Sequence, residues 1–187
     1  MLQRYRLSQW LSGTVCGLCL VSTCFADDAV KQADSFFNIY QSICLKHLGN
    51  MDEARQKLKP LPALPPEKAA HFLAGHAGTA WPVPDKHGVF VLAIYEKKDF
   101  CAVYVRRVKA DLADTKFATT FSKAPAPLVA KLMDDERSTN ANQVATRPQS
   151  YTWAAPGAKR KMLFTLTTST SAHAPLQGML SASIIRE

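Results

Sequence analysis

The stretch that decides the fold is Gly75–Arg107, GHAGTAWPVPDKHGVFVLAIYEKKDFCAVYVRR. It contains the apolar run Val89–Tyr95 and a second apolar run, Phe100–Val105, separated only by the charged tetrapeptide EKKD. Two strand-like runs joined by a short charged turn predict a β-hairpin. We expect this hairpin to lie at the centre of a sheet, with a preceding strand over Thr79–Val83.

The register of this hairpin depends on where its turn lies. A turn centred on Lys97-Lys98 places six residues on one face, which we expect to pack against a helix: Phe90, Leu92, Ile94, Cys101, Val103 and Val105. Val91, Tyr95, Tyr104 and Arg106 then lie on the opposite face. A three-residue turn would change this register.

Upstream of the hairpin, residues Asp27–Leu48 predict a long amphipathic helix. Its apolar residues recur at spacings of three and four: Val30, Ala33, Phe37, Tyr40, Cys44 and Leu48. Acidic residues near its start and Gly49 at its end fit the two helix termini.

Residues 1–26 predict a secretory signal peptide that is removed after Ala26. Arg4 and Arg6 form a positive segment, a short apolar segment follows, and small residues precede the expected cut. The apolar segment is shorter than the roughly 20 residues of a membrane-spanning helix, so we expect no span after processing. A competing interpretation treats Val21–Cys24 as a lipobox, in which Cys24 is acylated and anchors the protein to a membrane.

Cleavage after Ala26 leaves Cys44 and Cys101 as the cysteines of the mature chain. A pair of cysteines in an oxidising compartment predicts one disulfide, which would join the first helix to the second strand of the hairpin. A catalytic or metal-binding thiolate is the alternative, but neither cysteine has a CxxC partner or an adjacent activating motif.

The remaining chain alternates between short helical and strand patterns. We expect helices at Met51–Leu58, Pro66–Leu73, Asp111–Phe121 and Pro127–Met133, a polar loop at Asp134–Asn142, and strands at Val144–Trp153, Lys161–Thr168 and Gly178–Ile185. Pro148 suits an edge strand better than a central one. The pattern predicts a single α+β domain over residues 27–187, with an antiparallel sheet of five or six strands and further helices inserted in mid-chain.

The formal net charge is +8, and the basic residues are scattered along the chain. Export argues against nucleic acid as the partner. We expect a protein or an anionic polymer of the bacterial envelope instead as the partner, although a solvated basic surface is the simpler explanation of the charge.

Motifs for catalysis and for cofactors are missing from the sequence. The five histidines lack metal-ligand spacing, and no nucleotide-binding loop is present, so we expect no metal and no cofactor. The one region with candidate nucleophiles is the Ser/Thr tract at Thr165–Ser171 with His173 nearby, but it has no nucleophile elbow and no SxxK motif. An envelope hydrolase that uses Ser169, Ser171 and His173 is therefore the second interpretation.

Five residues are candidates for ligand binding: His76, Trp81, Tyr95, Tyr104 and Arg106. Gly75 and Gly78 permit close approach of a partner to the backbone, and a tryptophan beside them could anchor that partner. A core position for Trp81 at the start of a strand is the structural alternative.

At Gly75, Gly78, Trp81, Cys101 and the Thr167-Thr168-Ser169 strand end, the chain resembles a family of small proteobacterial exported proteins and lipoproteins of uncharacterised function. The resemblance implies export and lipidation, and it implies no catalytic residue. Together with the residue patterns, it leads us to expect a non-enzymatic binding protein, periplasmic or secreted. An inhibitor or an immunity-type partner would belong to this class.

Overall fold

The computed structural model describes residues 21–136, 138–139 and 145–186. The helices of this part of the chain are α1 (Val21–Tyr40), the π-helical η1 (Gln41–Leu45), α2 (Met51–Leu58), α3 (Pro66–Leu73) and α4 (Ala110–Phe121). Its strands are β1 (Gly78–Val83), β2 (Phe90–Tyr95), β3 (Phe100–Val105), β4 (Val129–Asp134), β5 (Ser138–Thr139), β6 (Ala145–Ala154), β7 (Arg160–Thr168) and β8 (Gly178–Arg186).

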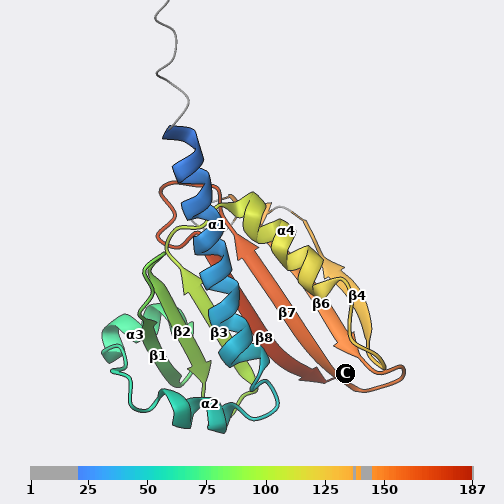
Figure 1. Cartoon of the computed structure of the whole chain (residues 1–187). Coiled ribbons are helices and arrows are strands. Elements are labelled where there is room, and N and C mark those ends of the chain that lie inside the picture. The colour runs from blue at the N-terminus through green and yellow to red at the C-terminus, as the bar shows by residue number, and fades with distance from the viewer. Residues whose placement is uncertain (1–20, 137, 140–144, 187) are drawn as a thin grey trace, which may run out of the picture.

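Seven strands form one antiparallel sheet in the order β1-β2-β3-β8-β7-β6-β4, and the short β5 pairs with β6 beside it. Figure 1 shows α1 and α4 lying across the same face of this sheet, which we call the helix face. The opposite face, which we call the back face, is covered by α3 over β1 and β2. The chain is therefore α+β, as predicted, but the sheet has seven strands and not five or six.

The core lies between the helix face and the two long helices. Large apolar side chains from both layers are fully buried there, including Phe36, Tyr40, Phe117, Phe121 and Phe164. Phe121 stacks on Phe164 with ring centroids 4.6 Å apart, and Trp153 meets the same ring edge-on at 4.9 Å. The aromatic packing fastens α4 to β6 and β7.

The long N-terminal helix is confirmed, with different ends. Within the described residues it extends from Val21, and its regular part stops at Tyr40, where a wider turn follows with Lys46 N–H bonded to the Gln41 carbonyl at 3.1 Å. Five of the six predicted stripe residues are buried. Val30 is the exception: 44% of its surface is exposed, because it lines an open hollow between α1 and α4.

The predicted hairpin register is confirmed. Phe90 pairs with Val105, Leu92 with Val103, and Ile94 with Cys101, and these residues all face the helices. The predicted disulfide is also present: Cys44 of η1 is bonded to Cys101 of β3, across a sequence separation of 57 residues. The cross-link holds the end of the first helical segment against the middle of the sheet.

The helix predicted at Pro127–Met133 is wrong, because this segment forms strand β4. Val129, Leu132 and Met133 have helical spacing, but a segment of this length gains little from helix formation alone. It gains a full ladder of backbone hydrogen bonds by pairing with β6. The segment Asp134–Asn142, predicted as a loop, includes β5, while residues 137 and 140–142 lie outside the described part.

Pro148 explains why the neighbours of β6 change along its length. One side of β6 pairs with β7 throughout, whereas the other side pairs with β5 at Thr146 and with β4 from Ser150 onward. Pro148 lies in the gap between these two partners, where its missing N–H costs no ladder hydrogen bond. The prediction of an edge strand is wrong, because β6 lies between β7 and β4, and Pro148 is tolerated at the gap between β5 and β4.

The predicted signal peptide lies mostly outside the described residues. Residues 21–26 form the first part of α1, so the expected cut after Ala26 falls within a helix. Among the described helices, none combines the length and the apolar character that a membrane-spanning segment requires.

Candidate functional site

Three of the five predicted binding residues come together on the back face. The rings of His76 and Tyr95 lie 4.7 Å apart, and Tyr95 stacks on Phe100 at 4.1 Å. Tyr104 lies beside Tyr95 and donates a hydrogen bond from its hydroxyl to the Phe72 carbonyl at 2.8 Å. Burial raises the pKa of both tyrosines, so both hydroxyls stay protonated at neutral pH.

A cleft of about 500 Å³ opens beside this cluster, between α3 and the outer edge of β1. His76 lines the cleft, and its Nδ1 atom lies 3.3 Å from the Lys98 ammonium nitrogen, within hydrogen-bond distance. Most of the other lining residues are small or apolar: Leu64, Pro66, Ala69, Ala70, Leu73, Gly75, Ala77, Gly78, Thr79 and Ala80. The cleft offers shape and apolar contact but few polar groups for orienting a ligand.

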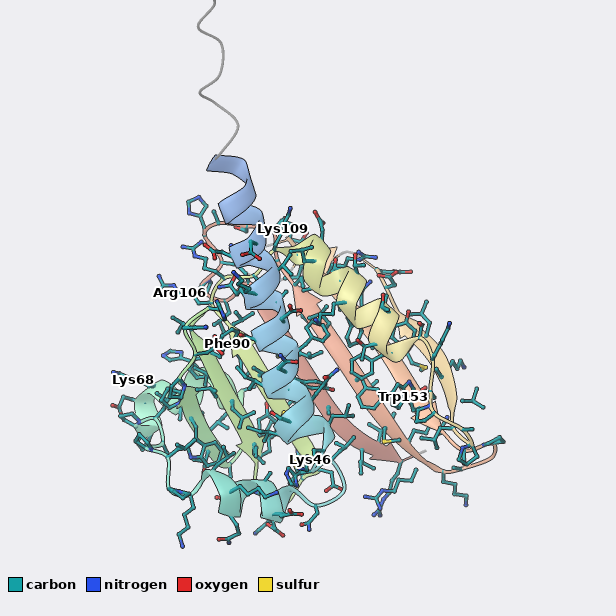
Figure 2. The ribbon with its side chains drawn as sticks, viewed as in Figure 1. Lys46, Lys68, Phe90, Arg106, Lys109 and Trp153 are labelled. Atoms are coloured by element: carbon teal, nitrogen blue, oxygen red, sulfur yellow. A yellow bond between two sulfur atoms is a disulfide. The ribbon has the colours of Figure 1, made fainter. Side chains whose placement is uncertain are left out.

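Trp81 and Arg106 do not join this cluster. Trp81 faces the helices and is only 5% exposed, which is the core position weighed as its alternative. Arg106 follows the end of β3, with its backbone N–H bonded to the Val89 carbonyl, and Figure 2 shows it at the rim of the sheet. The five predicted residues therefore do not form a single site.

The residues of the hydrolase interpretation lie in a turn after β7. Ser169 donates its hydroxyl to the Ala145 carbonyl at 2.9 Å, and the Ser171 hydroxyl accepts from the His173 backbone N–H at 3.3 Å. Both hydroxyls thus stabilise local backbone, as short polar side chains do in turns. Within the described residues, no hydrogen bond joins the His173 ring to either serine, and no three His, Cys, Asp or Glu side chains cluster as metal ligands would.

The half of the back face that α3 leaves uncovered carries a group of hydroxyl side chains. They come from β6, β7 and β8, and we call them the hydroxyl face: Ser150, Thr152, Thr165, Thr167, Ser181 and Ser183. None of the six side chains has a hydrogen-bond partner among the described residues. Thr165, Thr167 and Ser183 are partly exposed and can meet solvent or a ligand, whereas Ser150, Thr152 and Ser181 are buried.

The strand register shows why α3 covers only one half of the back face. One cross-strand row runs through the sheet as Ala80, Ala93, Ala102, Ser181, Thr165 and Ser150. Ala69 and Leu73 of α3 belong to one buried cluster with the three alanines, and α3 packs on β1 and β2, where small side chains let a helix approach closely. The same row continues as three hydroxyl residues beyond the helix. No described helix packs on them, and Thr165 is partly exposed while Ser150 and Ser181 are buried.

A basic hollow lies at one end of the hydroxyl face, where β4 and the β6–β7 hairpin meet. It has a volume of about 500 Å³ and is lined by Thr152 together with Lys131, Lys159 and Lys161. Its other lining residues are apolar or glycine: Val129, Ala154, Ala155, Pro156, Gly157 and Ala158. No carboxylate lines it, so the potential in the hollow is positive.

A network of charged side chains at the other end of β6 has a structural role. Arg147 bridges Asp114 of α4, at 2.9 Å, and Asp135, at 2.7 Å, while Thr168 donates to Asp114 at 2.9 Å. Desolvation by itself would lower the pKa of Arg147. The hydrogen bonds and ion pairs to Asp135 and Asp114 outweigh it, so the pKa is raised above its ordinary value. Gln149 donates to Asp135, and its own carbonyl oxygen is buried without a partner in the described structure.

Sequence reasoning did not identify either the hydroxyl face or the basic hollow. The alternation of Thr and Ser in β7 and β8 was visible, but it indicated only a solvated face of each strand. The missing information was the strand order, which brings these faces together and leaves them uncovered. Comparisons with known proteins add no further constraint: no family model, no curated protein and no solved structure matches this chain.

Proposed function

We propose that this protein is a non-enzymatic binding protein of the bacterial envelope, and that the hydroxyl face with its basic hollow holds an anionic polymer. One observation carries the proposal: half of the back face has no described helix packed on it and carries six hydroxyl side chains without partners among the described residues, three of them partly exposed. A monomeric sheet protein that merely needed solubility would more commonly place charged side chains there.

The chemistry of this surface suits an extended polyanion that also carries hydroxyl groups, such as an acidic polysaccharide. Serine and threonine hydroxyls both donate and accept hydrogen bonds, so they match sugar hydroxyls as well as anionic oxygens. Leu163, Met179 and Ile185 lie between them and offer apolar contact to ring faces. Lys131, Lys159 and Lys161 supply the positive charge at one end.

The size and openness of the surface also favour a polymer over a small molecule. The back face of β8, β7, β6 and β4 extends roughly 15 Å across the strands, at ~4.8 Å per strand spacing. It is not enclosed, whereas sites for small ligands bury most of the ligand surface. A chain that lies across several strands can gain affinity from many weak contacts.

Envelope location is supported by the disulfide and by the predicted export signal. Disulfides persist mainly in oxidising compartments, which include the bacterial periplasm and the cell exterior. The hydrolase interpretation gains no support, because the Ser169 and Ser171 hydroxyls are engaged with backbone groups.

The test uses dextran sulfate as an acidic polysaccharide and unmodified dextran of the same length as the neutral control. We expect binding to dextran sulfate that weakens as salt is added, and much weaker binding to dextran. Lys159→Glu and Lys161→Glu should each reduce the affinity by about tenfold at low salt. Lys68→Glu on α3, which makes the same change in net charge on the covered half, is the matched control.

The hydroxyl contribution is tested separately. Thr165→Val keeps the shape of the side chain and removes one hydrogen-bonding group, so we expect an affinity loss of about fivefold. The control is Thr115→Val, on an exposed position of α4 at the opposite face. Equal losses from Thr165→Val and Thr115→Val, or no measurable binding of dextran sulfate, would overturn the proposal.

A further inference from the structure

The two edges of the sheet differ in how they are protected. At β1, the Leu64 N–H from the proline-rich connector bonds to the Ala80 carbonyl at 2.8 Å, and Pro82 has no N–H to offer. Ala80 is fully buried. At β4, by contrast, five of the six residues are exposed and Ala130 is half-buried, so this edge is open to another strand.

The open edge is also unusually apolar. Val129, Leu132 and Met133 expose 58%, 51% and 50% of their surfaces, and they make up half of the large exposed hydrophobic residues in the described structure. Isolated surface hydrophobic residues are ordinary. Three of them on one edge strand, whose outer side has no partner strand among the described residues, indicate a contact surface.

The charges on β4 are arranged in a self-complementary way. A bulge at Met133 interrupts the pairing with β6, so that Lys131 opposes Thr152 and Asp134 opposes Ser150. Thr152 and Ser150 both lie on the back face, and the bulge therefore places Lys131 and Asp134 on that same face, on either side of Leu132. Lys131 has no ion-pair partner among the described residues, and Asp134 accepts a hydrogen bond only from the Glu136 backbone N–H.

We propose that β4 pairs with β4 of a second copy of this chain, antiparallel and about a two-fold axis at Leu132. In this register Leu132 faces its symmetry mate. Because Met133 bulges out of the pairing in each copy, each Lys131 then faces Asp134 of the other copy. A two-fold antiparallel pair requires opposed residues to lie on the same face, and the bulge at Met133 meets that requirement for Lys131 and Asp134. Lys131 and Asp134, which have no ion-pair partner among the described residues, thus form two ion pairs between chains.

The pairing would join two seven-stranded sheets into one continuous sheet. The hydroxyl faces of both copies would then lie on the same side of it, with Lys159 and Lys161 of each copy remaining in the basic hollow. Because strand pairing alone buries a modest area, we expect a dimer with a Kd of about 10–100 µM.

The experiment is sedimentation equilibrium on the protein purified from cells that express the full sequence, without any ligand. We expect a monomer–dimer equilibrium, and Lys131→Glu and Asp134→Lys should each weaken the dimer by about tenfold or more, since each replaces two attractions by two repulsions. The double variant Lys131→Glu/Asp134→Lys restores both ion pairs with reversed polarity, so it should recover the wild-type Kd. Lys68→Glu is the matched control, and Figure 2 shows Lys68 on α3 at the β1 side of the sheet.

Backbone hydrogen exchange gives an independent readout that needs no variant. Outward-facing amides of Val129–Asp134 should exchange more slowly as the protein concentration rises, while those of β1 should not change. A protein that stays monomeric up to about 1 mM would overturn the proposal. A dimer that survives both single reversals, or a double variant that fails to recover, would also overturn it, because either result places the interface elsewhere.

Discussion

Reduction of the Cys44–Cys101 disulfide should lower the stability of this protein by a large and calculable amount. The cross-link closes a loop of 57 residues. In the chain-entropy treatment, a loop of this length restricts the unfolded chain by about 4 kcal/mol at room temperature. The free energy of unfolding should therefore fall by about 4 kcal/mol on reduction, a decrease in Tm of roughly 8–16 °C for a chain of this size.

The structure gives a reason to expect nearly the full loss of about 4 kcal/mol in the free energy of unfolding. Both cysteines are completely buried, and both belong to the core that joins the helices to the sheet. The loop between them contains α2, α3, β1 and β2, so the cross-link restricts a large part of the chain when it unfolds. Without the bond, these elements are held only by their packing.

The assay is urea unfolding of the wild-type protein with and without a reductant, followed by circular dichroism, with thiol titration to confirm that both cysteines are reduced. The slope of the free energy with urea should rise on reduction, because the unfolded chain becomes more extended. The variant Cys44→Ala/Cys101→Ala is the control, since the reductant should not affect it. An unchanged free energy of unfolding in fully reduced wild-type protein would refute the reasoning.

Two further predictions test the core and the buried tyrosines. Phe164→Ala should cost about 3–5 kcal/mol in urea unfolding, because the ring is fully buried between Phe121 and Trp153, whereas Leu163→Ala on the back face should cost much less. Burial raises the pKa of Tyr40 and Tyr104 above the ordinary value of 10.0, so the stability that depends on their neutral forms is complete below pH 10.0 and is lost as the pH rises through their folded-state values. Urea unfolding from about pH 8 to about pH 11 should show this loss, and Tyr104→Phe should make the decline shallower; an unchanged slope would contradict the assignment of Tyr104.

Local patterns were sufficient for the elements with strong periodicity. The stripe from Val30 to Leu48 predicted the first helix, and the runs on either side of Lys97-Lys98 predicted the hairpin in its observed register. The pattern failed at Val129–Asp134, where helical spacing over a short segment competed with strand pairing. Pairing with β6 decided the outcome, and no local signal in the segment itself indicates that partner.

The candidate binding residues also divide into those that a local pattern could place and those that depend on contacts between distant segments. The hairpin register placed Tyr95 and Tyr104 on one face, because register is a local feature, whereas the contact of His76 with Tyr95 appears only in the tertiary structure. Trp81 was an open choice between a ligand anchor and a core residue. Its place depended on which face of β1 meets the helices, and that face follows from the pairing of Trp81 with Leu92.

The sequence by itself determined most of the helices and strands, though not β4 or β5, and with the predicted removal of residues 1–26 it determined the pairing of Cys44 with Cys101, because periodicity and cysteine count are properties of the chain. Only the tertiary structure decided the strand order β1-β2-β3-β8-β7-β6-β4. That order places α3 on the alanine half of one cross-strand row, leaves the Ser/Thr half uncovered, and puts β4 at an open edge. The physical reason is that these surfaces arise from contacts between segments distant in sequence, which no local pattern encodes.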